Sequence, residues 1–221
     1  MKYIKSYKLF ESIEDDCLYI FDFDDTLADT PHFEDLAIEY LKEDVTIGSL
    51  LKKSIKLIGK SLDDIKMEHG RLYVNDPNEE ISVKGNWVRK KGRVYLVSPD
   101  SFYFQDMSFP TKTLELSKLY NSVKNKAIVT GRFKKVENKV LDSLKKFELD
   151  IPNKGLFCYP SKDESGDKLA NWKAKTIVEL IRKEGFKKAK YYDDKSKIVN
   201  AVVKAVKTQL PDIEFEGIKV K

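Results

Sequence analysis

Three aspartates, Asp22, Asp24 and Asp25, follow the apolar run Leu18–Phe21 in the stretch "CLYIFDFDDTLADT". Aspartate is among the residues that strands tolerate least, and carboxylates this close together repel one another when ionised. A bound cation, or a reaction that uses carboxylates, would account for the group. The alternative is an acidic turn that caps the next helix, a position that Asp and Thr commonly occupy.

Polar residues also follow three other short apolar runs. Ala127–Val129 precedes "TGR", Leu156–Cys158 precedes "YPSKD", and Ala189–Tyr192 precedes Asp193 and Asp194. Continuous apolar runs of this length are typical of buried parallel strands. Ligands of such sheets bind beyond the carboxyl ends of the strands, so Asp22, Thr130 and Asp193 are expected at one edge.

Amphipathic segments separate these strands. Apolar residues recur at helical spacing in Leu116–Val123, Phe133–Phe147, Trp172–Ile181 and Ile198–Val206. The segment Ile213–Val220 alternates with period two, which predicts an edge strand. Strands that alternate with helices predict an α/β fold, in which helices cover both faces of a parallel sheet.

Residues 31–110 break this pattern. They begin with helical periodicity (Phe33–Lys42, Ile47–Lys60) and continue with strand-like sequence, in which Arg89-Lys90-Lys91-Gly92 indicates a hairpin turn. We interpret the segment as a cap module inserted between the first and second strands of a core made of residues 1–30 and 111–221.

Composition limits the possible classes of protein. A chain of 221 residues, 41% hydrophobic and 35% charged, suits one domain or one core with an insertion. The net charge of +5 is compatible with anionic substrates but does not establish nucleic-acid binding. Cys17 and Cys158 lie apart in apolar runs, which favours reduced core thiols. His32 and His69 are the only histidines, and no Cys/His spacing suits structural zinc.

The N-terminal stretch is basic but lacks a continuous apolar core, so we expect no secretory signal. No apolar run reaches the length of a membrane span. The expected location is therefore the cytoplasm.

Four motifs together resemble the haloacid dehalogenase-like superfamily. "FDFDDTL" resembles its first motif, "AIVTGR" its second, "NWKAKTIVEL" can supply the lysine of the third, and "YYDDKSK" is similar to the paired acids of the fourth. They occur in the family's order and span nearly the whole core. The resemblance implies a Rossmann-like core with the insertion in the C1 cap position. The cap sequence itself carries no resemblance.

The resemblance also implies roles, and phosphoryl-transfer chemistry requires groups of these kinds. Asp22 would attack phosphorus and form an aspartyl-phosphate. Asp24 would protonate the leaving group and then accept a proton from water. The Thr130 hydroxyl would hold a phosphoryl oxygen. Mg²⁺ would bind the Asp22 carboxylate, the Asp24 backbone carbonyl and an acid of the fourth motif, Asp193 or Asp194.

Lys173 and Lys175 could each be the lysine of the third motif. The resemblance favours Lys173, since family members often place an aromatic residue before this lysine, as Trp172 is here. Lys168, Lys173 and Lys175 also cluster near an expected helix N-terminus, where cations are disfavoured unless an anion binds. Lys175 remains the alternative.

Other residues keep two interpretations. Gly131 and Arg132 are expected to contact substrate, although Arg132 could equally lie in the first turn of an exposed helix. Asp193 and Asp194 could cap the next helix instead of binding metal. We interpret Asp25 as a turn or capping residue and Thr26 as structural support for the first-motif loop.

The sequence thus predicts a Mg²⁺-dependent phosphomonoester hydrolase that acts on a phosphorylated small molecule or nucleotide. "TGR", "NWK" and "YYDDKSKIV" also resemble phosphatase-like domains of RNA-repair proteins and polynucleotide 3′-phosphatases, so a nucleic-acid end is an alternative substrate. Tyr95, Phe102, Tyr103 and Phe104 could stack on a base or fill a small cap. A phosphomutase and a non-catalytic binding protein of this fold remain alternatives; the intact Asp22 and Asp24 argue against the latter.

Overall fold

The computed structural model describes residues 13–30, 55–68, 71–84, 87–96, 110–160 and 166–220. The chain divides into two compact units: unit 1 comprises Met1–Thr30 and Phe109–Lys221, and unit 2 comprises Pro31–Ser108. The expected helix Phe33–Lys42 and most of Ile47–Lys60 lie outside the described residues, as do His32, His69, Phe102, Tyr103 and Phe104.

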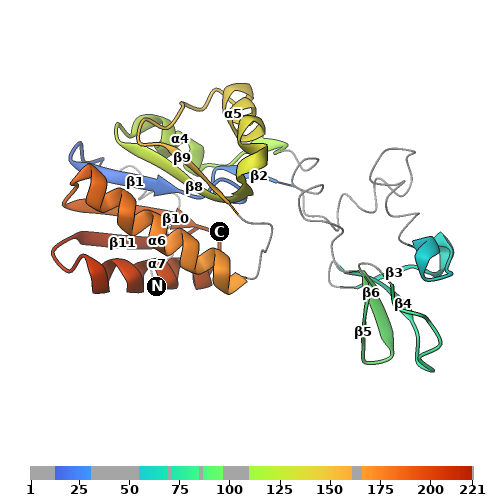
Figure 1. Ribbon diagram of the computed structural model, residues 1–221. Helices are drawn as coiled ribbons and strands as arrows, with labels where there is room; N and C mark the ends of the chain where they lie inside the picture. The colour runs from blue at the N-terminus through green and yellow to red at the C-terminus, as the bar shows by residue number, and fades with distance from the viewer. Residues whose placement is uncertain are drawn as a thin grey trace. The chain divides into compact units, whose positions relative to one another are not determined.

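A five-stranded parallel sheet forms the centre of unit 1 (Figure 1). Its strands, in spatial order, are β11 (Glu214–Lys219), β10 (Lys188–Asp193), β1 (Cys17–Phe21), β8 (Lys126–Phe133) and β9 (Leu156–Tyr159). From β1 the chain adds β8 and β9 on one side and then β10 and β11 on the other. The direction of strand addition therefore reverses beside β1, and such a switch point is where open α/β sheets bind ligands.

Helices cover both faces of this sheet (Figure 1). The helices α4 (Leu116–Ser122) and α5 (Glu137–Lys146) pack on the face that receives Cys17, Tyr19 and Phe21. The helices α6 (Gly166–Glu184) and α7 (Ser196–Gln209) pack on the opposite face, against Leu18 and Ile20. Every residue of β1 is buried because both of its faces are covered. The predicted α/β fold with a parallel sheet is confirmed.

Two elements of unit 1 differ from their predicted bounds. The strand β8 does not end before "TGR" but continues through Phe133, and α5 begins only at Glu137 after a short 3₁₀ turn, Lys134–Val136. The helix α6 begins at Gly166, so Lys173 lies two turns inside the helix. Lys173 therefore does not lie at the N-terminus of this helix, contrary to the prediction.

A two-stranded ladder joins the places where the chain leaves and re-enters unit 1. The strand β2 (Ala28–Asp29) pairs antiparallel with β7 (Lys112–Thr113). The amide of Leu114 donates to Leu27 O at 2.9 Å, and Lys112 Nζ lies 3.2 Å from Asp29 Oδ2. Two chain segments that are distant in the sequence are thus fixed side by side.

Unit 2 contains a four-stranded antiparallel sheet in the order β3 (Lys66–Glu68), β4 (Arg71–Asn75), β6 (Arg93–Leu96) and β5 (Trp87–Lys90), preceded by the 3₁₀ helix η2 (Leu62–Asp64). Its inner face buries Leu72, Val74, Trp87 and Val94 in a small apolar core. Lys91 and Gly92 connect β5 to β6 with φ of 51° and 70°. Two consecutive positive φ angles are typical of a two-residue hairpin turn, which confirms the turn predicted there.

Candidate functional site

Two of the predicted acids lie side by side where β1 and β10 end. Asp22 follows the last residue of β1, and its amide donates to Tyr192 O at 2.9 Å. Asp193 is the last residue of β10 and is fully buried, while Asp22 is 5% exposed. Isolated carboxylates are expensive to bury, so each needs a counter-charge nearby.

Lys173 supplies that charge to both. Its Nζ lies 2.8 Å from Asp22 Oδ2 and 2.9 Å from Asp193 Oδ2, and its side chain is 1% exposed. The alternative, Lys175, has a side chain that is 76% exposed and pairs with Glu179 on the helix surface. The structure therefore brings Lys173, and not Lys175, to the predicted nucleophile.

The three buried charges have unequal proton affinities. Burial raises the pKa of Asp22 to about 7, although Lys173 partly offsets the rise. Burial acts in the same direction on Asp193, but Lys173 and a hydrogen bond from Tyr191 outweigh it, and the pKa of Asp193 lies below its ordinary value. Burial alone would lower the pKa of Lys173, yet the two carboxylates raise it. Lys173 therefore stays protonated and Asp193 stays ionised.

Asp194 completes a group of acids that suits a hard cation. Asp22, Asp193 and Asp194 each offer a carboxylate oxygen, and these oxygens lie within 4.8 Å of one another. Burial and the nearby Asp193 charge raise the pKa of Asp194 to about 6, although Lys195 opposes the rise. Carboxylate oxygens are ligands that Mg²⁺ prefers, and a cation bound here would relieve the repulsion between these acids. The part assigned to the Asp24 backbone carbonyl stays a prediction.

Asp24 is held by a different cation. Arg132 Nε lies 3.1 and 3.0 Å from the two Asp24 carboxylate oxygens, Arg132 Nη2 lies 2.8 Å from Oδ1, and the Thr30 hydroxyl donates to Oδ1 at 2.6 Å. Burial raises the pKa of Asp24, but Arg132 and Thr30 outweigh it, so the pKa lies below its ordinary value. Arg132 is a buried strand residue, 4% exposed. Its alternative assignment to the first turn of an exposed helix was wrong.

The strand β8 is irregular at "TGR", where its pairing with β9 shifts register. Thr130 pairs with Cys158 and Phe133 with Tyr159, so Gly131 and Arg132 are extra residues relative to β9. Such bulges turn side chains away from the regular alternation. The Thr130 hydroxyl is fully buried and accepts the Arg132 amide at 3.2 Å. The bulge thus places Arg132 on Asp24, a contact that the spacing of the sequence did not reveal.

Two polar partners of these acids, Thr30 and Tyr191, were not predicted from the sequence. The Tyr191 hydroxyl, fully buried, donates to Asp193 Oδ2. Tyr191 lies two residues before Asp193 on one strand and therefore projects to the same face. That spacing was a usable signal. The Thr30 contact with Asp24 had no comparable signal.

The structure also describes the other residues that were predicted to form turns, caps or core contacts. Asp25 has φ of 56°, and its amide donates to Ala28 O in the turn after β1, which agrees with the assigned turn role. Asp193 Oδ1 accepts the Lys195 amide at 2.7 Å, directly before α7, so Asp193 serves the helix entry as well as Lys173. Thr26 is buried, and its hydroxyl has no hydrogen-bond partner among the residues that the structure describes. The thiols Cys17 and Cys158 are free and buried, as predicted.

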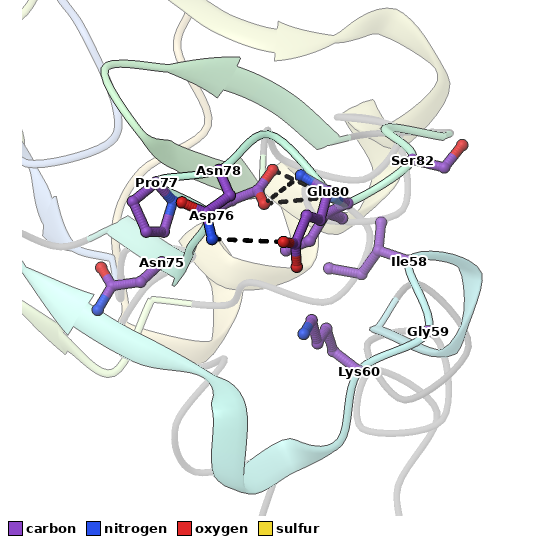
Figure 2. Close-up of a pocket in the computed structure, with 10 residues that line it drawn as sticks. Ile58, Gly59, Lys60, Asn75, Asp76, Pro77, Asn78, Glu80 and Ser82 are labelled. Atoms are coloured by element: carbon purple, nitrogen blue, oxygen red, sulfur yellow. Dashed lines mark hydrogen bonds between the residues drawn. The ribbon is translucent and has the colours of Figure 1, made fainter.

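Unit 2 contains a polar hollow of about 340 Å³ beside the turn after β4 (Figure 2). Its buried acid, Asp76, accepts the amides of Glu80 and Ile81 and pairs with Arg89 Nη2 at 2.6 Å. Arg89 Nη2 also donates to Ile81 O. Both charges are therefore satisfied within the fold, which makes this turn structural. Arg89, grouped in the sequence with Lys90 and Lys91, is part of that support.

Comparisons with models of protein families, with curated proteins and with solved structures find no match to this chain. Within the described ranges, no helix combines the length and the apolar composition needed to cross a bilayer.

Proposed function

We propose that the protein is a Mg²⁺-dependent phosphomonoester hydrolase that forms an aspartyl-phosphate on Asp22. The observation that carries the proposal is the Lys173 ammonium, buried between Asp22 and Asp193 where the strand order of the sheet reverses. A buried Asp–Lys–Asp group with a perturbed carboxyl pKa at a ligand-binding edge is costly for the fold and is typical of a catalytic site. The motif resemblance to the haloacid dehalogenase-like superfamily supports the same reaction.

In the first step, an Asp22 oxygen attacks phosphorus, and the bond from phosphorus to the ester oxygen breaks. The departing oxygen takes a proton from Asp24. In the second step, water attacks the aspartyl-phosphate while Asp24 accepts a proton from that water, so Asp22 and inorganic phosphate are released. Both steps use the same two carboxylates, and each leaves the protein in the state that the other requires.

Arg132 links substrate binding to this proton transfer. While Arg132 contacts Asp24, the low pKa of Asp24 keeps it ionised and suited to accept a proton. To donate one, Asp24 must lose part of that contact. A phosphoryl dianion is the natural competitor for a guanidinium. Arg132 would therefore turn from Asp24 toward the substrate, while Lys173 and the Thr130 hydroxyl hold other phosphoryl oxygens.

The carboxylates of Asp22, Asp193 and Asp194 would hold Mg²⁺, which when bound neutralises charge on the phosphoryl oxygens. Among these residues only Asp22 reacts. Asp193, already contacted by Lys173 and the Lys195 amide, is the more fixed of the two neighbouring acids. Asp194, half-buried, is the more accessible.

A nucleic-acid end is the second candidate substrate, and the outer face of the unit 2 sheet favours it. Lys66, Tyr73, Tyr95 and Val88 form one row of register partners across the four strands; Asn75, Arg93 and Lys90 form the next row. The Arg93 guanidinium lies 4.4 Å from the centre of the Tyr73 ring, and Tyr95 is 5.7 Å from Tyr73. Tyr73 is only 8% exposed, so of these two rings the half-buried Tyr95 is the one open to a base, with the basic groups of Lys66, Arg93 and Lys90 around it.

Turnover of p-nitrophenyl phosphate tests the proposed function. The parent protein should release p-nitrophenol with Mg²⁺ and lose this activity in EDTA, and Asp22→Asn should be inactive under both conditions. A panel of sugar phosphates, nucleotides and 3′- and 5′-phosphorylated oligonucleotides then separates the substrate classes. A folded parent protein that turns over none of these compounds would favour the non-catalytic alternative. Transfer of phosphate to a second hydroxyl of a sugar phosphate would indicate a mutase.

A further inference from the structure

Tyr191 carries a hydroxyl that the apolar packing around it does not need. The residue is fully buried and belongs to the apolar cluster between the sheet and helices α6 and α7. A buried hydroxyl costs free energy unless it forms a hydrogen bond, and phenylalanine would fill the same space without that cost. In the part of the chain that the structure describes, the hydroxyl donates to Asp193 Oδ2.

Asp193 is thereby held by three donors. Lys173 and Tyr191 share Oδ2, and the Lys195 amide donates to Oδ1 at 2.7 Å. A carboxylate with donors on both oxygens is fixed in one rotamer. Lys173 Nζ contacts Asp193 and Asp22 at nearly equal distances, so a rotation of the Asp193 carboxylate would move the ammonium relative to Asp22.

We propose that Tyr191 is a positioning residue, which orients Asp193 so that Lys173 is held against the Asp22 carboxylate. The inference rests on the proposed function, because the ammonium position matters for catalysis only if Asp22 is the nucleophile. Tyr191 itself lies behind Asp193 and contacts no reacting atom. Its loss should slow the chemical step and leave substrate affinity nearly unchanged.

Tyr191→Phe tests the proposal, and Tyr192→Phe is the matched control. Tyr192 is the next residue of the same strand and is also buried, but it projects to the opposite face, where its ring stacks on Phe21 at 5.0 Å. With p-nitrophenyl phosphate, Tyr191→Phe should lower kcat about tenfold and change KM by less than about twofold. Tyr192→Phe should leave both constants close to those of the parent.

A second readout does not depend on turnover. The Lys195 amide donates to Asp193, so its proton resonance reports the orientation of that carboxylate. Tyr191→Phe should shift this resonance, and Tyr192→Phe should not. Replacing Tyr191 with 3-fluorotyrosine, whose hydroxyl is a stronger donor, preserves packing and should shift the same resonance in the opposite direction.

The two hypotheses fail in different ways. If the parent is active and Tyr191→Phe keeps the parent's kcat, the positioning role is overturned. It is also overturned if Tyr191→Phe and the control Tyr192→Phe change kcat and KM alike. An inactive parent with the expected Lys195 shifts contradicts the proposed function and leaves the Tyr191–Asp193 contact standing as a structural one only. An unshifted Lys195 resonance in both Tyr191 variants overturns the proposal whatever the activity.

Discussion

Arg132 and Asp24 form a two-pronged ion pair, in which Nε lies 3.0 Å from Oδ2 and Nη2 lies 2.8 Å from Oδ1. The Arg132 side chain is 5% exposed and that of Asp24 29% exposed, so the open side of the pair is the carboxylate. This arrangement makes the protonation of Asp24 depend on what else Arg132 contacts.

Asp24→Asn should slow substrates in proportion to how much their leaving group needs a proton. Alkyl phosphates should lose about 10²-fold or more in kcat, because general acid–base catalysis contributes that much. p-Nitrophenyl phosphate, which departs without protonation, should lose far less. Steady-state rates on both substrates check this. Equal losses would assign Asp24 to metal binding or to structure.

Asp22→Asn should abolish turnover and stabilise the metal-free fold above neutral pH. The pKa of Asp22 is raised to about 7, so the folded state binds its proton more tightly than the unfolded chain, in which the pKa is about 3.9. Stability of the parent should therefore fall as pH rises from about 4 to about 7.

Because asparagine does not ionise, the variant should exceed the parent by about 1–3 kcal/mol at pH 8 in EDTA, and by less at pH 5. Urea unfolding at the two pH values measures the difference. A constant gap across this range would contradict the raised pKa. Retention of near-normal kcat by Asp22→Asn with Mg²⁺ would contradict the covalent mechanism.

Lys173→Met and Lys175→Met form a matched pair two residues apart on α6. Lys173→Met leaves two buried carboxylates without their counter-charge, so it should destabilise the protein by about 3 kcal/mol and remove turnover. Lys175 is exposed, and its variant should change stability by less than about 0.5 kcal/mol. Urea unfolding and kinetics of both variants decide whether the third-motif lysine was assigned correctly. Equal effects of the two changes would show that it was not.

The outer face of the unit 2 sheet can be tested without disturbing its core. Lys66 and Lys90 are both exposed there, so Lys66→Gln/Lys90→Gln should fold normally. If a nucleic-acid strand binds this face, the double variant should lower kcat/KM for a phosphorylated oligonucleotide several-fold at low salt. The loss should shrink as salt rises, because phosphate contacts act through counterion release.

Hydrolysis of p-nitrophenyl phosphate by this double variant should barely change. Arg89 is left intact because it neutralises buried Asp76, so its replacement would weaken unit 2 itself. Parent-like activity of the double variant on oligonucleotides at low salt would remove this face from the binding surface and favour a small-molecule substrate.

The sequence predicted the sheet because apolar runs and polar strand ends carry strong local signals. Each expected core strand is present, and Asp22 and Asp193 meet at one edge as parallel geometry requires. The sequence also contained a second indication for Lys173 that the prediction did not use. Lys173 occupies the buried stripe of α6, four residues before Ile177, where a lysine is anomalous unless paired. Lys175 lies off that stripe.

What the sequence could not predict depends on irregular backbone and on contacts between distant segments. The Arg132–Asp24 pair requires a register shift in β8, and periodicity describes only regular strands. Arg89 and Lys90 have different surroundings because successive residues of a strand face opposite sides. Arg89 points inward to Asp76, whereas Lys90 points outward.

The β2–β7 ladder bears on how the segment that forms unit 2 could be replaced by another. Asp29 and Lys112 are partners on the same rung, so everything between them is, topologically, the loop of a hairpin. The cost of closing such a loop grows only slowly with its length, by about 0.6 kcal/mol for each doubling. The β2–β7 ladder, and not the segment between its two strands, preserves the register of the five-stranded sheet. Segments of very different length can therefore be exchanged at this point while the carboxylates at the strand ends stay where they are.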